Sequence, residues 1–198
     1  YYLYPGGGAI GSPPFFYLLL GFFAWVFGAG SPTEKVIETV GAYLPAILGA
    51  LVTVPVYFIG KELLNRKAGL LAAALIAILP GQFLWRSMLG FPDYHITETL
   101  FSATAMMFLI IALKSAKQKE ISFKSLLKRD WGTLRRPLIY SLLAGIALGL
   151  YLLTWSGAGL FILIIFAFGV VQYIIDHIRG RSTDYVGIVG VISLAIAL

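Results

Sequence analysis

Long apolar runs separated by short polar stretches organise this chain from end to end. The runs extend for about 16 to 22 residues and lack the alternation in polarity that is typical of membrane-spanning strands. About 20 apolar residues in a helix cross the hydrocarbon core of a bilayer, and a helix pairs its own backbone polar groups there. The pattern therefore predicts an all-α fold, a polytopic bundle of transmembrane helices.

Six runs are read as membrane spans. They cover residues 40–60, 68–89, 95–113, 138–154, 158–176 and 185–198. The last run reaches the final residue and the chain begins without Met, so both ends are expected to be cuts through a longer protein. A seventh apolar stretch, residues 13–28, is short and rich in aromatic residues, which favour the membrane interface. It is expected to lie on the bilayer or dip into it, within an external segment of residues 1–39.

The positions of Lys and Arg predict which ends of the spans face the cytoplasm. Thirteen of the 15 basic residues lie in three alternate connections, residues 61–67, 114–136 and 177–182. Cytoplasmic loops of membrane proteins carry such an excess. The remaining connections, including residues 90–94 and 155–157, are then external.

Composition agrees with a membrane protein and excludes several kinds of site. Hydrophobic residues make up 59% of the chain and charged residues 12%, and the mean hydropathy is +0.88, whereas soluble domains carry about 25% charged residues. The basic residues behind the net charge of +6 lie mainly in the loops, so the charge indicates membrane topology rather than a nucleic-acid partner. The absence of cysteine excludes disulfides, thiolate metal sites and a cysteine nucleophile.

One short segment gathers groups capable of chemistry. Residues 85–98 contain Arg86, Asp93, His95 and Glu98 at the external ends of two spans. Charged groups near a bilayer are costly and therefore suggest a function. Asp93 and His95 could together bind one divalent cation; the pair suits Mn, Fe or Zn, and carboxylate alone also suits Mg. Glu98 lies on the same helical face as His95.

The same residues also allow a structural interpretation. Asp93 is a common helix cap, and His95 and Glu98 have the spacing of a side-chain pair on a helix. The Arg86 side chain can extend to lipid head groups. From these residues alone, both interpretations stay open.

A second external segment, residues 154–157, contains Trp155 and Ser156 between two spans. Its structural interpretation is an interface anchor followed by a tight turn. Its functional interpretation is a lining for a lipid phosphate. From these residues alone, the structural interpretation is favoured.

Four segments, taken in order, resemble the catalytic subunit of oligosaccharyltransferase, in its archaeal single-subunit form (AglB) and its bacterial form (PglB). Residues 4–14 resemble the end of the first external loop of that family, and residues 54–63 the end of its second membrane helix. Residues 86–95 resemble its second acidic motif in the archaeal Asp-x-His form. Residues 154–157 resemble the external turn between its fifth and sixth helices.

This resemblance implies a GT-C-type glycosyltransferase membrane domain, in the cell membrane of a prokaryote, archaeal by its motif, with an external active site. Such enzymes act in protein N-glycosylation. They transfer an oligosaccharide from a polyprenyl (dolichyl) phosphate or pyrophosphate to Asn in Asn-x-Ser/Thr. The implied partners are the lipid-linked oligosaccharide, the acceptor polypeptide and membrane lipid.

The resemblance also implies roles for single residues. Asp93 and His95 would be catalytic ligands of a divalent cation, Mn or Mg, and Arg86 would lie near the carrier phosphate. Trp155 and Ser156 would line the site of the lipid carrier. The first-loop acidic residue, a later glutamate and the soluble C-terminal domain that reads the acceptor are absent from the sequence, so this fragment is expected to be inactive alone.

Three alternatives compete with this interpretation. Another polyprenyl-phosphate-dependent GT-C enzyme, such as a protein mannosyltransferase or an aminoarabinose transferase, would share the membrane architecture. A transporter or channel predicts polar residues at mid-span and interrupted helices, whereas the centres of these spans are nearly free of ionisable residues. A non-catalytic scaffold subunit stays open.

Overall fold

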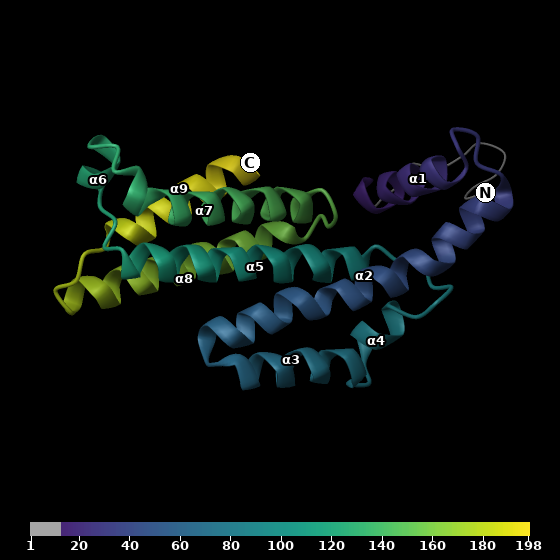
Figure 1. Cartoon of the computed structure of the whole chain (residues 1–198), viewed down its shortest axis with the longest axis horizontal. Helices are drawn as coiled ribbons and strands as arrows, with labels where there is room; N and C mark the ends of the chain where they lie inside the picture. Colours follow the sequence, from purple (N-terminus) through teal and green to yellow (C-terminus); the bar gives the residue numbers. More distant parts are fainter. Residues whose placement is uncertain (1–12) are drawn as a thin grey trace.

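The computed structural model describes residues 13–198, and all regular secondary structure in that part of the chain is α-helical. This confirms the predicted all-α membrane fold. The helices, shown in Figure 1, are α1 (Phe15–Phe27), α2 (Glu34–Leu63), α3 (Arg66–Ile78), α4 (Gln82–Arg86), α5 (His95–Gln118), α6 (Phe123–Leu127), α7 (Trp131–Leu152), α8 (Ala158–Ile178) and α9 (Asp184–Ala197). Of the first segment of the family resemblance, residues 4–12 lie outside the described residues.

Three of these helices, α2, α5 and α8, are long and apolar enough to cross a membrane. The 24 residues of α5 give a length of about 36 Å, compared with a hydrocarbon core of about 30 Å. Together with its composition, this makes the chain an integral membrane protein. The complete set of six spans stays a prediction. So does the interfacial position of α1, whose 13 residues reach only about 20 Å.

The continuous helix expected at residues 68–89 is divided in two, and this prediction was wrong. The helix α3 ends at Ile78, and Leu79 is extended with φ −66° and ψ 119°. A proline disfavours the helical conformation of the residue before it and cannot donate to the helical ladder. Pro80 therefore ends α3, and α4 starts anew at Gln82 in a different direction (Figure 1).

Helix α5 occupies the centre of the bundle and packs against α2, α7 and α9. Small side chains make close packing possible, because Ala112 and Ala116 are fully buried within the cluster shared with α7 and α9. At the other end of α5, Ile96 joins a second cluster with Phe16 of α1 and Val52 of α2. A third cluster, which contains Ala105 of α5 and Leu148 of α7, lies between these two, so α5 is packed along its whole length.

A buried carboxylate attaches α8 to this centre. Asp176 of α8 is fully buried. It accepts hydrogen bonds from Tyr185 Oη of α9 at 2.5 Å and from Gln172 Nε2 at 2.7 Å, and Lys117 Nζ of α5 lies 3.3 Å from it. Most of α8 is otherwise exposed. The polar network around Asp176 is therefore the main attachment of α8 at that end.

The connections between the long helices gather at two ends of the molecule. In Figure 1 the turn between α2 and α3, the segment with α6, and the turn between α8 and α9 lie toward the left. The α4–α5 connection and the α7–α8 turn lie toward the right. The thirteen basic residues of the three alternate connections thus belong to one end of the bundle.

We expect Ser156→Cys and Ser182→Cys, introduced separately into cysteine-free full-length protein, to label from opposite sides of the membrane. Both serines are exposed and they flank α8. The basic connections predict that an impermeant thiol reagent labels position 156 in intact cells and position 182 only after permeabilisation. Labelling of position 182 in intact cells, with position 156 protected, would show that the orientation is reversed.

Candidate functional site

The candidate site lies on the connection between α4 and α5. Arg86 is the last residue of α4, and His95 is the first residue of α5. Between them Gly90 adopts φ +85°, a conformation that L side chains rarely take. Its backbone N–H donates to the carbonyl of Ala42 on α2 at 2.9 Å. The turn and this hydrogen bond place the connection against the first half of α2.

A glycine on α2 allows α4 to end close to that helix. A Cβ atom at Gly49 would lie 2.5 Å from the Cβ of Ser87, which is less than two carbon atoms can approach without contact strain. Ser87 directly follows Arg86. The missing side chain at Gly49 therefore determines where α4 ends and where the Arg86 backbone lies.

Arg86 is held by two partners. Its guanidinium forms an ion pair with Asp93 through Nη1 and Oδ2, and its Nε donates to Gln82 Oε1 at 3.2 Å. The Arg86 side chain is 29% exposed and that of Asp93 is 14% exposed. Two contacts on one planar guanidinium restrict its orientation more than a single contact would. Arg86 is therefore positioned rather than free to extend toward lipid.

Asp93 also supports the start of α5. Its Oδ1 accepts a hydrogen bond from the backbone N–H of His95 at 3.3 Å, one of the donors that a helix start leaves without an internal partner. The N-cap of α5 is Tyr94, so Asp93 supports the helix start from the position before the cap. One oxygen serves the helix start, and the other carries the interaction with Arg86.

His95 is oriented by Glu98. Its Nδ1 lies 2.8 Å from Glu98 Oε2, at the i,i+3 spacing expected on a helix, and the ring of Tyr94 lies 4.1 Å from the imidazole. A carboxylate on one ring nitrogen fixes the orientation and tautomer of a histidine, as is usual for metal-bound histidines. Nε2 is then the nitrogen that carries a lone pair for a cation.

A cavity of about 210 Å³ adjoins these groups. Its polar lining consists of Gln82, Arg86, His95, Glu98 and Thr99. Gln82 is a site residue that the sequence analysis missed. The signal that could have found it is its i,i+4 spacing from Arg86 on one helix.

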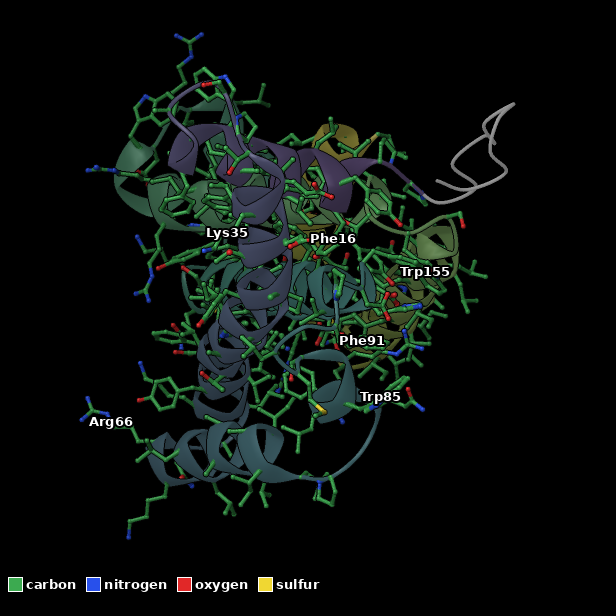
Figure 2. The ribbon with its side chains drawn as sticks, turned by 90° about the vertical axis from the view of Figure 1, so that its right-hand side faces the viewer. Phe16, Lys35, Arg66, Trp85, Phe91 and Trp155 are labelled. Carbon is green, nitrogen blue, oxygen red and sulfur yellow. The ribbon has the colours of Figure 1, made fainter. Side chains whose placement is uncertain are left out.

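The second predicted segment lies apart from this group. Trp155 and Ser156 follow α7, and the Trp155 ring packs against Tyr151 at 6.1 Å. Figure 2 looks onto the end of the bundle that carries both segments and labels Trp85, Phe91 and Trp155 there. Within residues 13–198, no hydrogen bond or ion pair joins Trp155 or Ser156 to Arg86 or Asp93.

Asp93 and His95 do not by themselves complete a metal centre. Among the described residues, no group of three or more His, Asp or Glu side chains could hold a metal ion. Two donors with suitable chemistry are present, and Glu98 is engaged with His95. A cation at this place would need further ligands from beyond this part of the chain.

Comparison with known proteins gives a consistent result along the chain. A family model described as "Oligosaccharyl transferase STT3, N-terminal" matches residues 1–198. The dolichyl-monophosphooligosaccharide–protein glycotransferase AglB of Haloferax volcanii is 37% identical over 173 residues, covering 87% of this chain. Dolichyl-phosphooligosaccharide-protein glycotransferase 3 of Archaeoglobus fulgidus is 34% identical over 194 residues, covering 98%. The chain spans 16% and 21% of the length of these two relatives.

Solved structures of an Archaeoglobus fulgidus oligosaccharyltransferase share the fold. A form tethered to an acceptor peptide containing the NVT sequon matches with a TM-score of 0.82 and 32% identity, over 98% of this chain and 22% of that one. A complex with Zn and sulfate matches with a TM-score of 0.79 and 31% identity, over 98% of this chain and 23% of that one. A complex of AglB with an inhibitory peptide and a dolichol-phosphate matches with a TM-score of 0.78 and 30% identity, over 94% of this chain and 20% of that one.

Replacement of Gly49 by alanine should destabilise the α2–α4 contact. The added Cβ would overlap Ser87, and overpacking of this kind costs about 1–3 kcal/mol. We expect a lower unfolding temperature for the Gly49→Ala variant of the full-length protein. Gly41→Ala on the same helix is the matched control, because its Cβ would meet Leu20 at an ordinary 3.7 Å. Equal unfolding temperatures for the two variants would contradict the close approach.

Proposed function

This chain belongs to the STT3 oligosaccharyl transferase family, as part of its N-terminal region, and we propose that the longer protein is a membrane enzyme of N-glycosylation. It transfers an oligosaccharide from a dolichyl phosphate or pyrophosphate to the Asn side chain of Asn-x-Ser/Thr in an acceptor polypeptide. The observation that carries this proposal is the similarity to archaeal glycotransferases along nearly the whole chain, at 37% and 34% identity. It favours this reaction over the other GT-C reactions and over transport.

The substrates of related structures support the same partners. One Archaeoglobus fulgidus structure holds an inhibitory peptide and a dolichol-phosphate, and another is tethered to a peptide with the NVT sequon. A site at the ends of membrane helices suits such a pair, because the tail of the donor stays in lipid while its sugar and the acceptor stay in water. The Arg86–Asp93 connection occupies such a position.

In the proposed enzyme Asp93 and His95 hold a divalent cation, Mn or Mg. The donor chemistry fits, because a carboxylate oxygen and an imidazole nitrogen suit Mn and Zn, and a carboxylate suits Mg. A structure of the Archaeoglobus fulgidus relative holds Zn. When bound, the cation would supply positive charge that stabilises the departing phosphate. Asp93 and His95 provide two of its ligands, and the rest come from other parts of the longer protein.

Arg86 supplies a second positive charge for the carrier phosphate. As the bond between the sugar and the phosphate oxygen breaks, its electron pair stays on the phosphate. A guanidinium already oriented by Gln82 and Asp93 stabilises this charge without having to reorganise. Glu98 keeps the imidazole of His95 in one orientation. Trp155 and Ser156, at the same end of the bundle, are proposed to line the lipid carrier.

Substitution of Asp93 by Asn distinguishes a metal ligand from a side chain that only supports the start of α5. Asn caps a helix about as well as Asp and keeps an acceptor for the His95 N–H, but it lacks the charge that a cation needs. We expect glycan transfer by the purified full-length enzyme to fall by about 10²–10³-fold, with partial recovery at high Mn concentration. His95→Ala should show the same loss and the same dependence on metal.

The matched control is Arg86→Gln, because it removes the same ion pair and leaves the Asp93 carboxylate. We expect this variant to lower kcat, because it removes the charge that stabilises the departing phosphate, while the Mn concentration for half-maximal activity stays unchanged. Identical behaviour of Asp93→Asn and Arg86→Gln would assign the role of Asp93 to the ion pair. Normal transfer by folded Asp93→Asn enzyme would refute the proposed metal site.

Glu98 should tune metal affinity through His95. Loss of a carboxylate behind a metal-bound histidine typically weakens metal affinity by about 10–100-fold. We expect Glu98→Ala to raise the Mn concentration for half-maximal activity within this range. Glu98→Gln should raise it less, because an amide oxygen can still accept from His95 Nδ1. Unchanged metal dependence in Glu98→Ala would show that the pair is structural only.

A further inference from the structure

A basic cup lies at the end of α5 remote from His95. It is a cavity of about 320 Å³ lined by Lys119, Gly132, Arg135, Arg136, Ile139 and Tyr140. Three of these six residues carry a positive charge. The length of α5, about 36 Å, separates the cup from the candidate active site. The cup is therefore outside the machinery proposed above.

Two of the three cations are held in place by neighbouring groups. Lys119 Nζ donates to the carbonyl of Gly132 at 2.7 Å. The guanidinium of Arg136 lies over the Tyr140 ring, 5.9 Å from its centroid, at a distance typical of cation–π contacts. These contacts leave the positive charges themselves uncompensated. The cup is thus partly organised before any ligand binds.

Acidic side chains do not neutralise the cup. Among the ion pairs of residues 13–198, none includes Lys119, Arg135 or Arg136. Asp130 is close enough for Lys119 to contribute to its lowered pKa, but the main cause is the hydrogen bond from Thr133. A second carboxylate, Glu62, lines an adjoining pocket together with Arg136, but it pairs with Lys114 at 3.0 Å. The three cations of the cup therefore keep a net positive charge.

An apolar stripe continues from the cup along the outer face of α7. Ile139, Leu142 and Ile146 follow at i,i+3 and i,i+7 spacing and are 44%, 46% and 46% exposed. From Arg136 to Ile146 the stripe extends for about 15 Å. A cluster of cations above such a stripe complements one kind of molecule, with an anionic head and an apolar tail.

We propose that the cup of Lys119, Arg135 and Arg136 binds the phosphate head group of an anionic membrane lipid, with its tail along Ile139, Leu142 and Ile146. By the distribution of basic residues this lipid belongs to the cytoplasmic leaflet. The carrier lipid of the proposed reaction acts at the other end of the bundle. The site in the cup is therefore for a bulk anionic lipid.

The neighbouring segment provides the matched control. Around α6 the cations Lys124, Lys128 and Arg129 lie beside three exposed apolar side chains. These are Phe123, Leu127 and Trp131, with exposed fractions of 55%, 85% and 64%. These cations add the same charge near the membrane surface but do not line the cup. If lipid binding came from general electrostatic attraction, removal of either set of cations would weaken it equally. A defined site requires the cations that line the cup.

The test uses full-length protein in nanodiscs that contain phosphatidylcholine and phosphatidylglycerol, with retained lipid measured by native mass spectrometry. We expect wild-type protein to retain phosphatidylglycerol in preference to phosphatidylcholine. Removal of each cation that contacts the bound head group should cost about fivefold, so Lys119→Gln, Arg135→Gln and Arg136→Gln together should reduce retention roughly a hundredfold. Lys124→Gln, Lys128→Gln and Arg129→Gln together should leave the preference for phosphatidylglycerol in place.

A charge-preserving variant and a competition with phosphate distinguish the possible causes of a loss of lipid binding. Arg135→Lys with Arg136→Lys keeps the charge and should keep most of the binding, which separates charge loss from misfolding. Addition of inorganic phosphate should not displace the lipid, because the tail contributes to binding. Equal loss of phosphatidylglycerol retention in both triple Gln variants would show that the cup acts only as part of a general basic surface. The absence of any preference in wild-type protein would show that other parts of the protein cover the cup, and either result would overturn the proposal.

Discussion

The requirement that every backbone polar group in a bilayer be paired within the protein determines where chemistry can occur in this molecule. The long helices satisfy the requirement internally and present apolar surface to lipid. Functional polar groups are then restricted to helix ends, where water and head groups are near. Arg86 ends one helix and His95 begins the next, so both lie where a charged side chain can be kept without a large penalty.

Helix α5 connects the two regions that carry proposed functions. Its first turn contains His95 and Glu98, and its last residues lead to the basic cup at Lys119. Burial of Ala112, Ala116 and other small residues holds it against its neighbours along its length. A helix fixed in this way supports both ends at a constant separation. The site on its first turn therefore depends on packing far from the reacting groups.

The sequence predicted the features that depend on local pattern. Helical class, the location of the polar cluster and the His95–Glu98 spacing all follow from periodicity within a few residues. The division of α3 from α4 was missed, although Pro80 marks it, because membrane helices often tolerate proline. The contact of Ser87 with Gly49 and the Gly90–Ala42 hydrogen bond join positions 38 and 48 residues apart in sequence, and no local pattern encodes them. The Arg86–Asp93 ion pair depends on that turn, so the sequence did not predict it either.

The partners of the buried Asp176 carboxylate come from helices that are synthesised at different times. Helices enter the membrane from the N-terminus onward during synthesis, so α5 is in place before α8 emerges. An ionised side chain without a partner is costly at the edge of the hydrocarbon region, and Lys117 on α5 relieves that cost. Tyr185 arrives later, with α9, and completes the coordination. The cation that pairs with Asp176 of α8 is thus supplied by a helix that is synthesised earlier.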